Sequence, residues 1–269
     1  MAGLFQVLWG QSDNKFKSAA VLTGTDNKPL IIPIEGDQYQ TENICTRPVA
    51  VDWDGDEDLD LVVGNFAGSF YLFTGEGKGK FNPEPVLIKT PDNKSLKVPG
   101  MHSDPFVIDW DCYGDLDLLS GSNAGGVYWA ENTAAKGHKR PLFKGFELLI
   151  KTQGRVSNNS FLREEDITGP TVSTRIWVDD VNSDGKLDIL VGDRVSLTSP
   201  ANGLSETECQ QKLAEWEKEQ AVIMAELNNP KAEKDKRQEV MKRYSAHYQQ
   251  RRSFVTQTTT GFVWLYIQK

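Results

Sequence analysis

The sequence has few cysteines and no long apolar segment, and each absence excludes a class of protein. Its 269 residues include three cysteines, spaced too widely for a zinc motif or a disulfide framework. No apolar run approaches the ~20 residues that span a bilayer, so we expect no membrane insertion. The N-terminal segment has neither the basic region nor the long apolar region of a secretion signal. Sequence motifs of hydrolases, phosphate-binding loops and dinucleotide sites are also missing, so no catalytic residue is predicted.

Positive charge is scarce relative to negative charge. Lys and Arg total 30 against 38 Asp and Glu, which gives a formal net charge of −8. Binding to nucleic acids or to anionic membranes relies on a basic surface, so we expect no nucleic-acid partner. An acidic chain attracts cations instead.

What the sequence does contain is an internal repeat. Three segments each place an apolar run before an acidic loop and follow the loop with Leu-Asp and further apolar residues. They read VDWDGDEDLDLVVGN, IDWDCYGDLDLLSGS and DDVNSDGKLDILVGD. Their first loop aspartates are Asp52, Asp109 and Asp180, which are 57 and 71 residues apart. Further β-rich runs follow each loop, and four antiparallel strands in roughly 55–70 residues are typical of one β-propeller blade.

The two ends of the chain have the pattern of incomplete blades. Residues 4–9 and 16–23 resemble the third and fourth strands of a blade, and residues 261–267 resemble a third strand. We therefore predict an all-β fold, a β-propeller of about four blade equivalents over residues 1–204 with a last strand in 254–269. The ends supply five strands where one blade needs four, which favours a fragment of a larger propeller. The alternative is that strands from the two ends pair to close a ring.

Residues 205–253 interrupt this pattern with a composition that favours helix. Ser205 and Glu208 have the spacing of a capping box. Two apolar faces at helical spacing follow, formed by Leu213, Trp216, Ile223 and Leu227 and then by Val240, Met241, Tyr244 and Tyr248. The segment predicts a helical hairpin inserted between the second and third strands of the last blade. It is either a solvated surface excursion or a coiled coil through which the protein self-associates.

The acidic loops have the ligand pattern of a calcium site. Ca²⁺ takes six to eight oxygen ligands, and alternate positions of a tight loop can supply them. In the first loop these are Asp52, Asp54, Asp56 and Asp60 at positions 1, 3, 5 and 9, with the backbone carbonyl of Asp58 at position 7. The corresponding residues of the third loop are Asp180, Asn182, Asp184 and Asp188, with the carbonyl of Lys186.

An EF-hand and a catalytic carboxylate pair both fit these loops less well. An EF-hand needs an acidic residue at position 12, where the first and third loops have Val63 and Val191. A catalytic carboxylate pair needs to occur once, whereas this pattern recurs. Without a cation the clustered carboxylates would repel one another.

The second loop departs from the pattern and is the weaker candidate. Asp109, Asp111 and Asp117 occupy positions 1, 3 and 9, and Asp115 occupies position 7. Position 5 is Tyr113, so one carboxylate is lost. We therefore predict two calcium sites, in the first and third loops, with this loop as a weaker third.

The loops, their flanking strands and the trailing glycine resemble the FG-GAP/VCBS repeats of integrin-α-like β-propellers. The whole chain is also similar to bacterial proteins of this type that carry a charged helical insert near the C-terminus. The resemblance implies calcium in each intact loop, an extracellular, periplasmic or cell-surface location, and a non-catalytic role in adhesion or in binding protein or glycan ligands. The alternatives are a polysaccharide lyase or hydrolase, or an accessory domain of one, and an assembly module that oligomerises through the hairpin.

Overall fold

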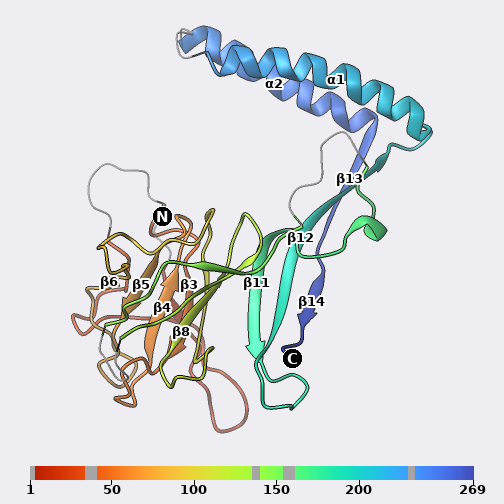
Figure 1. Cartoon of the computed structure of the whole chain (residues 1–269). Helices are drawn as coiled ribbons and strands as arrows, with labels where there is room; N and C mark the ends of the chain where they lie inside the picture. Colours follow the sequence, from red (N-terminus) through yellow and green to blue (C-terminus); the bar gives the residue numbers. More distant parts are fainter. Residues whose placement is uncertain (1–3, 34–40, 135–139, 154–160, 230–233) are drawn as a thin grey trace. The chain divides into compact units, whose positions relative to one another are not determined.

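The computed structural model describes residues 4–33, 41–134, 140–153, 161–229 and 234–269. These residues divide into two compact units (Figure 1). The stacked-sheet unit consists of Met1–Gly154, Pro170–Asp193 and Phe262–Lys269, and the hairpin unit consists of Arg155–Gly169 and Arg194–Gly261. Each unit is described in turn.

Two complete four-stranded antiparallel sheets form the middle of the stacked-sheet unit. In both, consecutive strands are hydrogen-bonded neighbours. Repeat 1 contains β3 (Arg47–Val51), β4 (Asp60–Gly64), β5 (Phe70–Phe73) and β6 (Val86–Leu87). Repeat 2 contains β7 (Asp104–Ile108), β8 (Asp117–Gly121), β9 (Val127–Ala130) and β10 (Glu147–Ile150). The prediction of antiparallel four-stranded repeats is confirmed.

Repeat 3 is built from β11 (Val172–Asp179), the first part of β12 (Asp188–Pro200) and β14 (Val263–Tyr266). Its register matches the other repeats, because Val263 pairs with Gly192 as Phe70 pairs with Gly64. β14 therefore occupies the place of a third strand, as predicted, although it comes more than sixty residues later in the chain.

A short N-terminal sheet precedes repeat 1. It consists of β1 (Gln6–Val7) and β2 (Ala20–Val21), which pair antiparallel. A bridge between Gly10 and Phe16 follows β1, as a bridge between Gly75 and Phe81 follows β5. The N-terminal sheet thus corresponds to the third and fourth strands of a repeat, although its strands are shorter than the predicted runs.

Apolar side chains alternate between the two faces of each sheet and form three consecutive clusters. We call the side of a sheet toward the following repeat its forward face and the opposite side its backward face. One cluster joins the N-terminal sheet to the backward face of repeat 1, where the rings of Phe5 and Phe73 lie 5.7 Å apart. The next joins the forward face of repeat 1 to repeat 2, and the third joins repeat 2 to repeat 3. The order in the chain is therefore the order of stacking.

The hairpin unit contains α1 (Glu206–Leu227) and α2 (Lys234–Gln250), followed by β13 (Val255–Thr260), which pairs with residues 195–200 of β12. Two short 3-10 helices, Glu164–Asp166 and Arg251–Ser253, complete it. The predicted capping box is present: Ser205 accepts a hydrogen bond from the Glu208 amide, and the Glu208 carboxylate accepts one from the Ser205 amide.

Trp216 and His247 hold the two helices together. Their rings stack at 4.8 Å, the indole N–H donates to the His247 carbonyl at 2.8 Å, and His247 Nε2 lies 2.9 Å from the Trp216 carbonyl. Both side chains are buried. Of the predicted second apolar face, Met241 is exposed, and Tyr248 lies at the edge of the interface, with its ring 6.3 Å from that of Trp216. The second apolar face is therefore narrower than the sequence pattern indicates.

The described strands form a stack of sheets, and no closed ring of sheets is seen among them. No helix among the described residues is long and apolar enough to cross a membrane.

Candidate functional site: the acidic loops

The three acidic loops connect equivalent strands in the three repeats, β3 to β4, β7 to β8 and β11 to β12. All three share a backbone path in which positions 4 and 6 have positive φ. At position 4 the values are 77° for Gly55, 63° for Cys112 and 61° for Ser183. A left-handed residue at position 4 turns the chain so that the amides of the next residues face position 1.

The position 1 aspartate closes each loop on itself. Asp52 accepts the amides of Gly55, Asp56 and Glu57 at 2.8 to 3.1 Å. In the second loop Asp109 accepts the Gly114 amide at 3.0 Å, and in the third loop Asp180 accepts two loop amides, at 2.8 and 3.0 Å. These hydrogen bonds hold the position 1 carboxylate inside its loop.

The position 9 aspartate has a second role that the sequence pattern does not reveal. It is buried in every repeat, and its two oxygens accept two different backbone amides. One comes from loop position 2, from Trp53, Trp110 or Val181. The other comes from the second residue after the third strand, from Gly75, Asn132 or Gln268. Asp60, Asp117 and Asp188 therefore fasten the loop to the end of the third strand.

Two loops bring three carboxylates together at a spacing that suits one metal ion. Asp52, Asp54 and Asp60 in the first loop, and Asp111, Asp115 and Asp117 in the second, each offer oxygens within 4.8 Å of one another. Oxygens of Asp109 and Asp115 in the second loop are also buried without a hydrogen-bond partner. Buried acceptors normally find a donor, so these two oxygens fit the ligand set of a hard cation.

The second loop supplies a side-chain carboxylate at position 7, where the predicted pattern needs only a backbone carbonyl. This residue, Asp115, joins the three-carboxylate group. Tyr113 at position 5 is 84% exposed and turned to solvent.

The acidic side chains of the third loop are less closely grouped than those of the other two loops. They do not form a group of three at the same spacing within the part of the chain that the structure describes. Asn182 instead donates its side-chain amide to Asp184 at 3.1 Å, and its carbonyl oxygen accepts the Asp184 amide at 2.8 Å. Both residues are exposed.

The remaining predicted ligands lie beside these groups. Asp56 accepts the amide of Asp58 at 3.0 Å, and Asp184 accepts the amide of Lys186 at 3.0 Å. Asp56 is exposed and Asp58 is partly buried. Neither belongs to the three-carboxylate group of the first loop.

Burial and crowding act on the protonation of the clustered carboxylates. The pKa of Asp60 is raised above the ordinary value, first by burial and further by the charges of Asp54 and Asp56. The pKa values of Asp115 and Asp117 are raised too, again mainly by burial, with the charge of Asp111 adding to both. A bound cation would oppose all three shifts because it stabilises the ionised forms.

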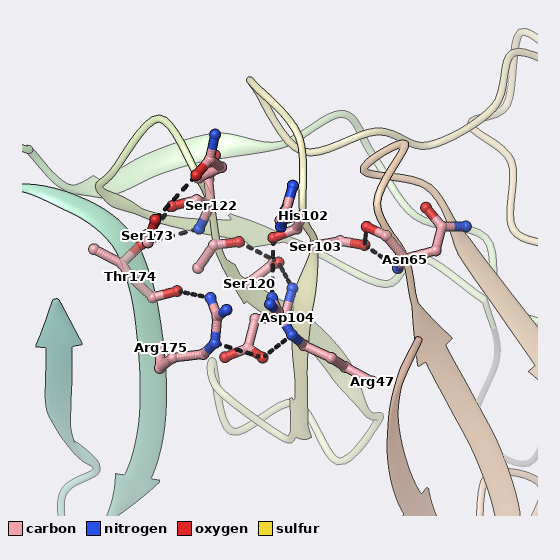
Figure 2. A network of polar contacts seen from close by, with 12 residues as sticks. Arg47, Asn65, His102, Ser103, Asp104, Ser120, Ser122, Ser173, Thr174 and Arg175 are labelled. Carbon is pink, nitrogen blue, oxygen red and sulfur yellow. Dashed lines mark hydrogen bonds and ion pairs between the residues drawn. The ribbon is translucent and has the colours of Figure 1, made fainter. Parts of the chain in front are cut away.

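A second polar cluster joins the first strands of the three repeats (Figure 2). Arg47, Asp104 and Arg175 each lie five residues before the first aspartate of their loop, on β3, β7 and β11. The Nε atoms of both arginines lie 3.6 Å from Asp104 Oδ1. The shared repeat position could have revealed this cluster from the sequence, but the residue type alternates from one repeat to the next.

Hydrogen bonds extend this cluster from repeat to repeat. Ser103 donates to the Ser69 carbonyl at 2.8 Å and accepts the Asn65 amide at 2.8 Å, which links repeats 1 and 2. Thr174 accepts the Ser122 amide at 2.9 Å, which links repeats 2 and 3. These contacts join neighbouring repeats at the end of the first strands that lies opposite the acidic loops.

The comparison with protein families supports the assignment of the first two loops to a known repeat. The model of the FG-GAP-like repeat matches residues 52–120, from the first loop aspartate to β8. No curated protein and no solved structure matches the chain. The matched span contains both three-carboxylate groups.

Proposed function

We propose that this protein is a calcium-stabilised, non-catalytic binding scaffold of the β-propeller type. The observation that carries the proposal is the pair of three-carboxylate groups, which occupy equivalent loops of consecutive repeats. A structural requirement of the fold explains such repetition better than a catalytic site does, because catalysis needs one site.

Calcium fits these loops by ligand chemistry. The first loop would hold the ion through Asp52, Asp54 and Asp60, with Asp56 and the carbonyl of Asp58 completing the shell. In the second loop the ligands would be Asp109, Asp111, Asp115 and Asp117. The third would use Asp180, Asn182, Asp184, Asp188 and the carbonyl of Lys186. When bound, the ion neutralises carboxylates that otherwise repel one another and fixes the loop.

The ligand of the scaffold is proposed to be a protein or a glycan outside the cell or at its surface. Extracellular calcium modules work with dissociation constants of about 10⁻⁴ to 10⁻³ M, and sites as exposed as the third loop suit that range. In this role the metal ions rigidify the loops while the surfaces of the repeats meet the ligand.

The proposal is tested by thermal unfolding of the full chain in excess Ca²⁺ and in chelator. At a concentration of about 100 times the dissociation constant, one site adds about 2.7 kcal/mol to the free energy of unfolding. We expect Ca²⁺ to raise the melting temperature of the wild type. The variants Asp54→Asn and Asp111→Asn should each lose part of the increase, and the double variant should lose more.

The matched control is Asp92→Asn, which removes the same charge from an exposed turn outside the loops, where Asp92 pairs with Lys94. It should keep the full increase. A melting temperature that Ca²⁺ leaves unchanged, or an increase that Asp92→Asn reduces as much as the loop variants do, would refute the proposal.

A further inference from the structure

The third repeat exposes the face that the other repeats bury. Phe70 in repeat 1 and Val127 in repeat 2 are fully buried on the forward face. By register with the second strand, the equivalent residue of repeat 3 is Val263, and its side chain is 73% exposed. Leu265, equivalent to the buried Leu72, is 49% exposed. The forward face of repeat 3 is therefore apolar and uncovered among the described residues.

The N-terminal sheet exposes the opposite face. The bridges after the third strands align Phe16 with Phe81 and Phe143, both of which are buried against the preceding sheet. Phe16 itself is 67% exposed. Leu8, two residues before the bridge, aligns with Phe73 and Ala130, which are buried, yet it is 55% exposed. Among the described residues, this backward face is also apolar and uncovered.

The contacts between repeats show what each of these faces packs against. Phe5 of the N-terminal sheet meets Phe73 of repeat 1, a forward residue on a backward residue. In the next interface, Trp53 of repeat 1 meets Phe143 of repeat 2, with the ring centroids 5.7 Å apart. Every such interface pairs a forward face with the backward face of the following sheet. The described part of the chain thus carries one unmatched face of each kind, at the two ends of its stack.

We propose that a second copy of this chain covers these faces, with the forward face of repeat 3 in one copy packed on the backward face of the N-terminal sheet in the next. The contact would continue the interfaces already present inside each copy. An interface between two different patches is heterologous, so it closes a ring if the rotation allows and otherwise extends. Two copies would bring about eight blade equivalents together, within the ~4–8 blades of known propellers.

The test is the mass of the full chain in solution, measured by sedimentation equilibrium with Ca²⁺ present. We expect the wild type to form particles of at least two chains, where one chain has a mass of 30.1 kDa. Val263→Asp and Phe16→Asp should each dissociate the assembly at the same protein concentration. Because both side chains are exposed, the variants should keep the circular dichroism spectrum of the wild type.

Mixing the two variants gives the decisive measurement. The Val263→Asp chain keeps its backward face and the Phe16→Asp chain keeps its forward face, so the mixture should form pairs although neither variant associates alone. Val222→Asp, on an exposed position of α1, is the control and should leave the assembly unchanged.

Three results would overturn the inference: a monomeric wild type, a mixture of the two end-face variants that stays monomeric, or an assembly that only Val222→Asp dissociates. The last result would assign association to the helical hairpin instead.

Discussion

The Asp117 carboxylate accepts the backbone amide of Asn132 at 2.8 Å, and its second oxygen accepts the amide of Trp110 at 3.2 Å. The same arrangement recurs at Asp60 and Asp188, although Gln268 lies 80 residues beyond its partner. The position 9 aspartate of each loop is thus both a candidate metal ligand and the acceptor that joins the loop to the end of the third strand.

Because Asp117 accepts two backbone amides, we expect Asp117→Asn to destabilise the protein even without metal. An amide has one acceptor oxygen, so its NH₂ group would face one of the two backbone N–H donors. Leaving a buried donor unsatisfied costs about 1–3 kcal/mol. Urea unfolding in chelator should show this loss. Asp111→Asn is the control, because it removes the same charge from the same loop and leaves both hydrogen bonds to Asp117 in place. An equally large loss of stability in this control would contradict the structural role of Asp117.

Because Tyr113 occupies a ligand position without supplying a carboxylate, we expect its replacement by aspartate to raise the Ca²⁺ affinity of the second loop. The tyrosine side chain is turned to solvent, so Tyr113→Asp adds a carboxylate at position 5 with little loss of packing. We expect the Ca²⁺ affinity of this loop to rise by about tenfold, equivalent to about 1.4 kcal/mol. Calorimetric titration in the Asp54→Asn background isolates this loop from the first. Tyr113→Phe, which adds no ligand, should leave the affinity unchanged; an equal gain in both variants would count against a ligand role for position 5.

The stacked pair of Trp216 and His247 predicts that the hairpin depends on one central contact. Trp216→Ala removes a buried ring and leaves the His247 carbonyl without its donor, at a cost of about 3–5 kcal/mol. Far-ultraviolet circular dichroism should show a loss of helix at a lower temperature than in the wild type. Val222→Ala on the exposed side of α1 is the control. Full retention of helix stability in Trp216→Ala would show that the contact is dispensable.

We expect the stability of the protein to depend on pH through the protonation of His102. Burial lowers its pKa below the ordinary value of 6.5, and the charges of Arg47 and Arg175 lower it further. Because the folded-state pKa is the lower one, the stability that neutral His102 contributes is present above pH 6.5 and is lost as the pH falls through the folded value.

His102→Asn isolates this contribution. Asn tolerates the φ of 59° at this position and does not titrate. In chelator, the melting temperature of the wild type should fall more than that of the variant between about pH 7.5 and about pH 5.5. The acidic loops titrate equally in both proteins, so their effect cancels. Parallel curves would contradict the assignment.

Much of the repeat architecture could be predicted from the sequence because it depends on local pattern. The acidic loops mark the first two strands of every repeat, and alternation of apolar residues marks the third. This pattern also identifies β14 as a third strand, since the residues around Trp264 resemble those around Tyr71 and Tyr128.

Other features depend on which segments meet in space, and local pattern does not encode them. The partner of Asp188 is Gln268, which reaches it only because β14 pairs with β12 after the helical hairpin. Leu8 lies in a run that the sequence predicts to be a strand, yet its side chain is exposed, because no sheet among the described residues covers the backward face on which it lies. Asp115 joins the second carboxylate group through the path of the loop, which spacing alone does not give.

The most direct test of the central claim is to count the calcium ions that the full chain binds. Equilibrium dialysis against buffered Ca²⁺, with the metal measured by atomic emission, gives this number without reference to stability. We predict at least two ions per chain at saturation, with one ion lost in Asp54→Asn and another in Asp111→Asn. Binding of less than one ion per chain at millimolar Ca²⁺, or a count that neither variant changes, would contradict the account.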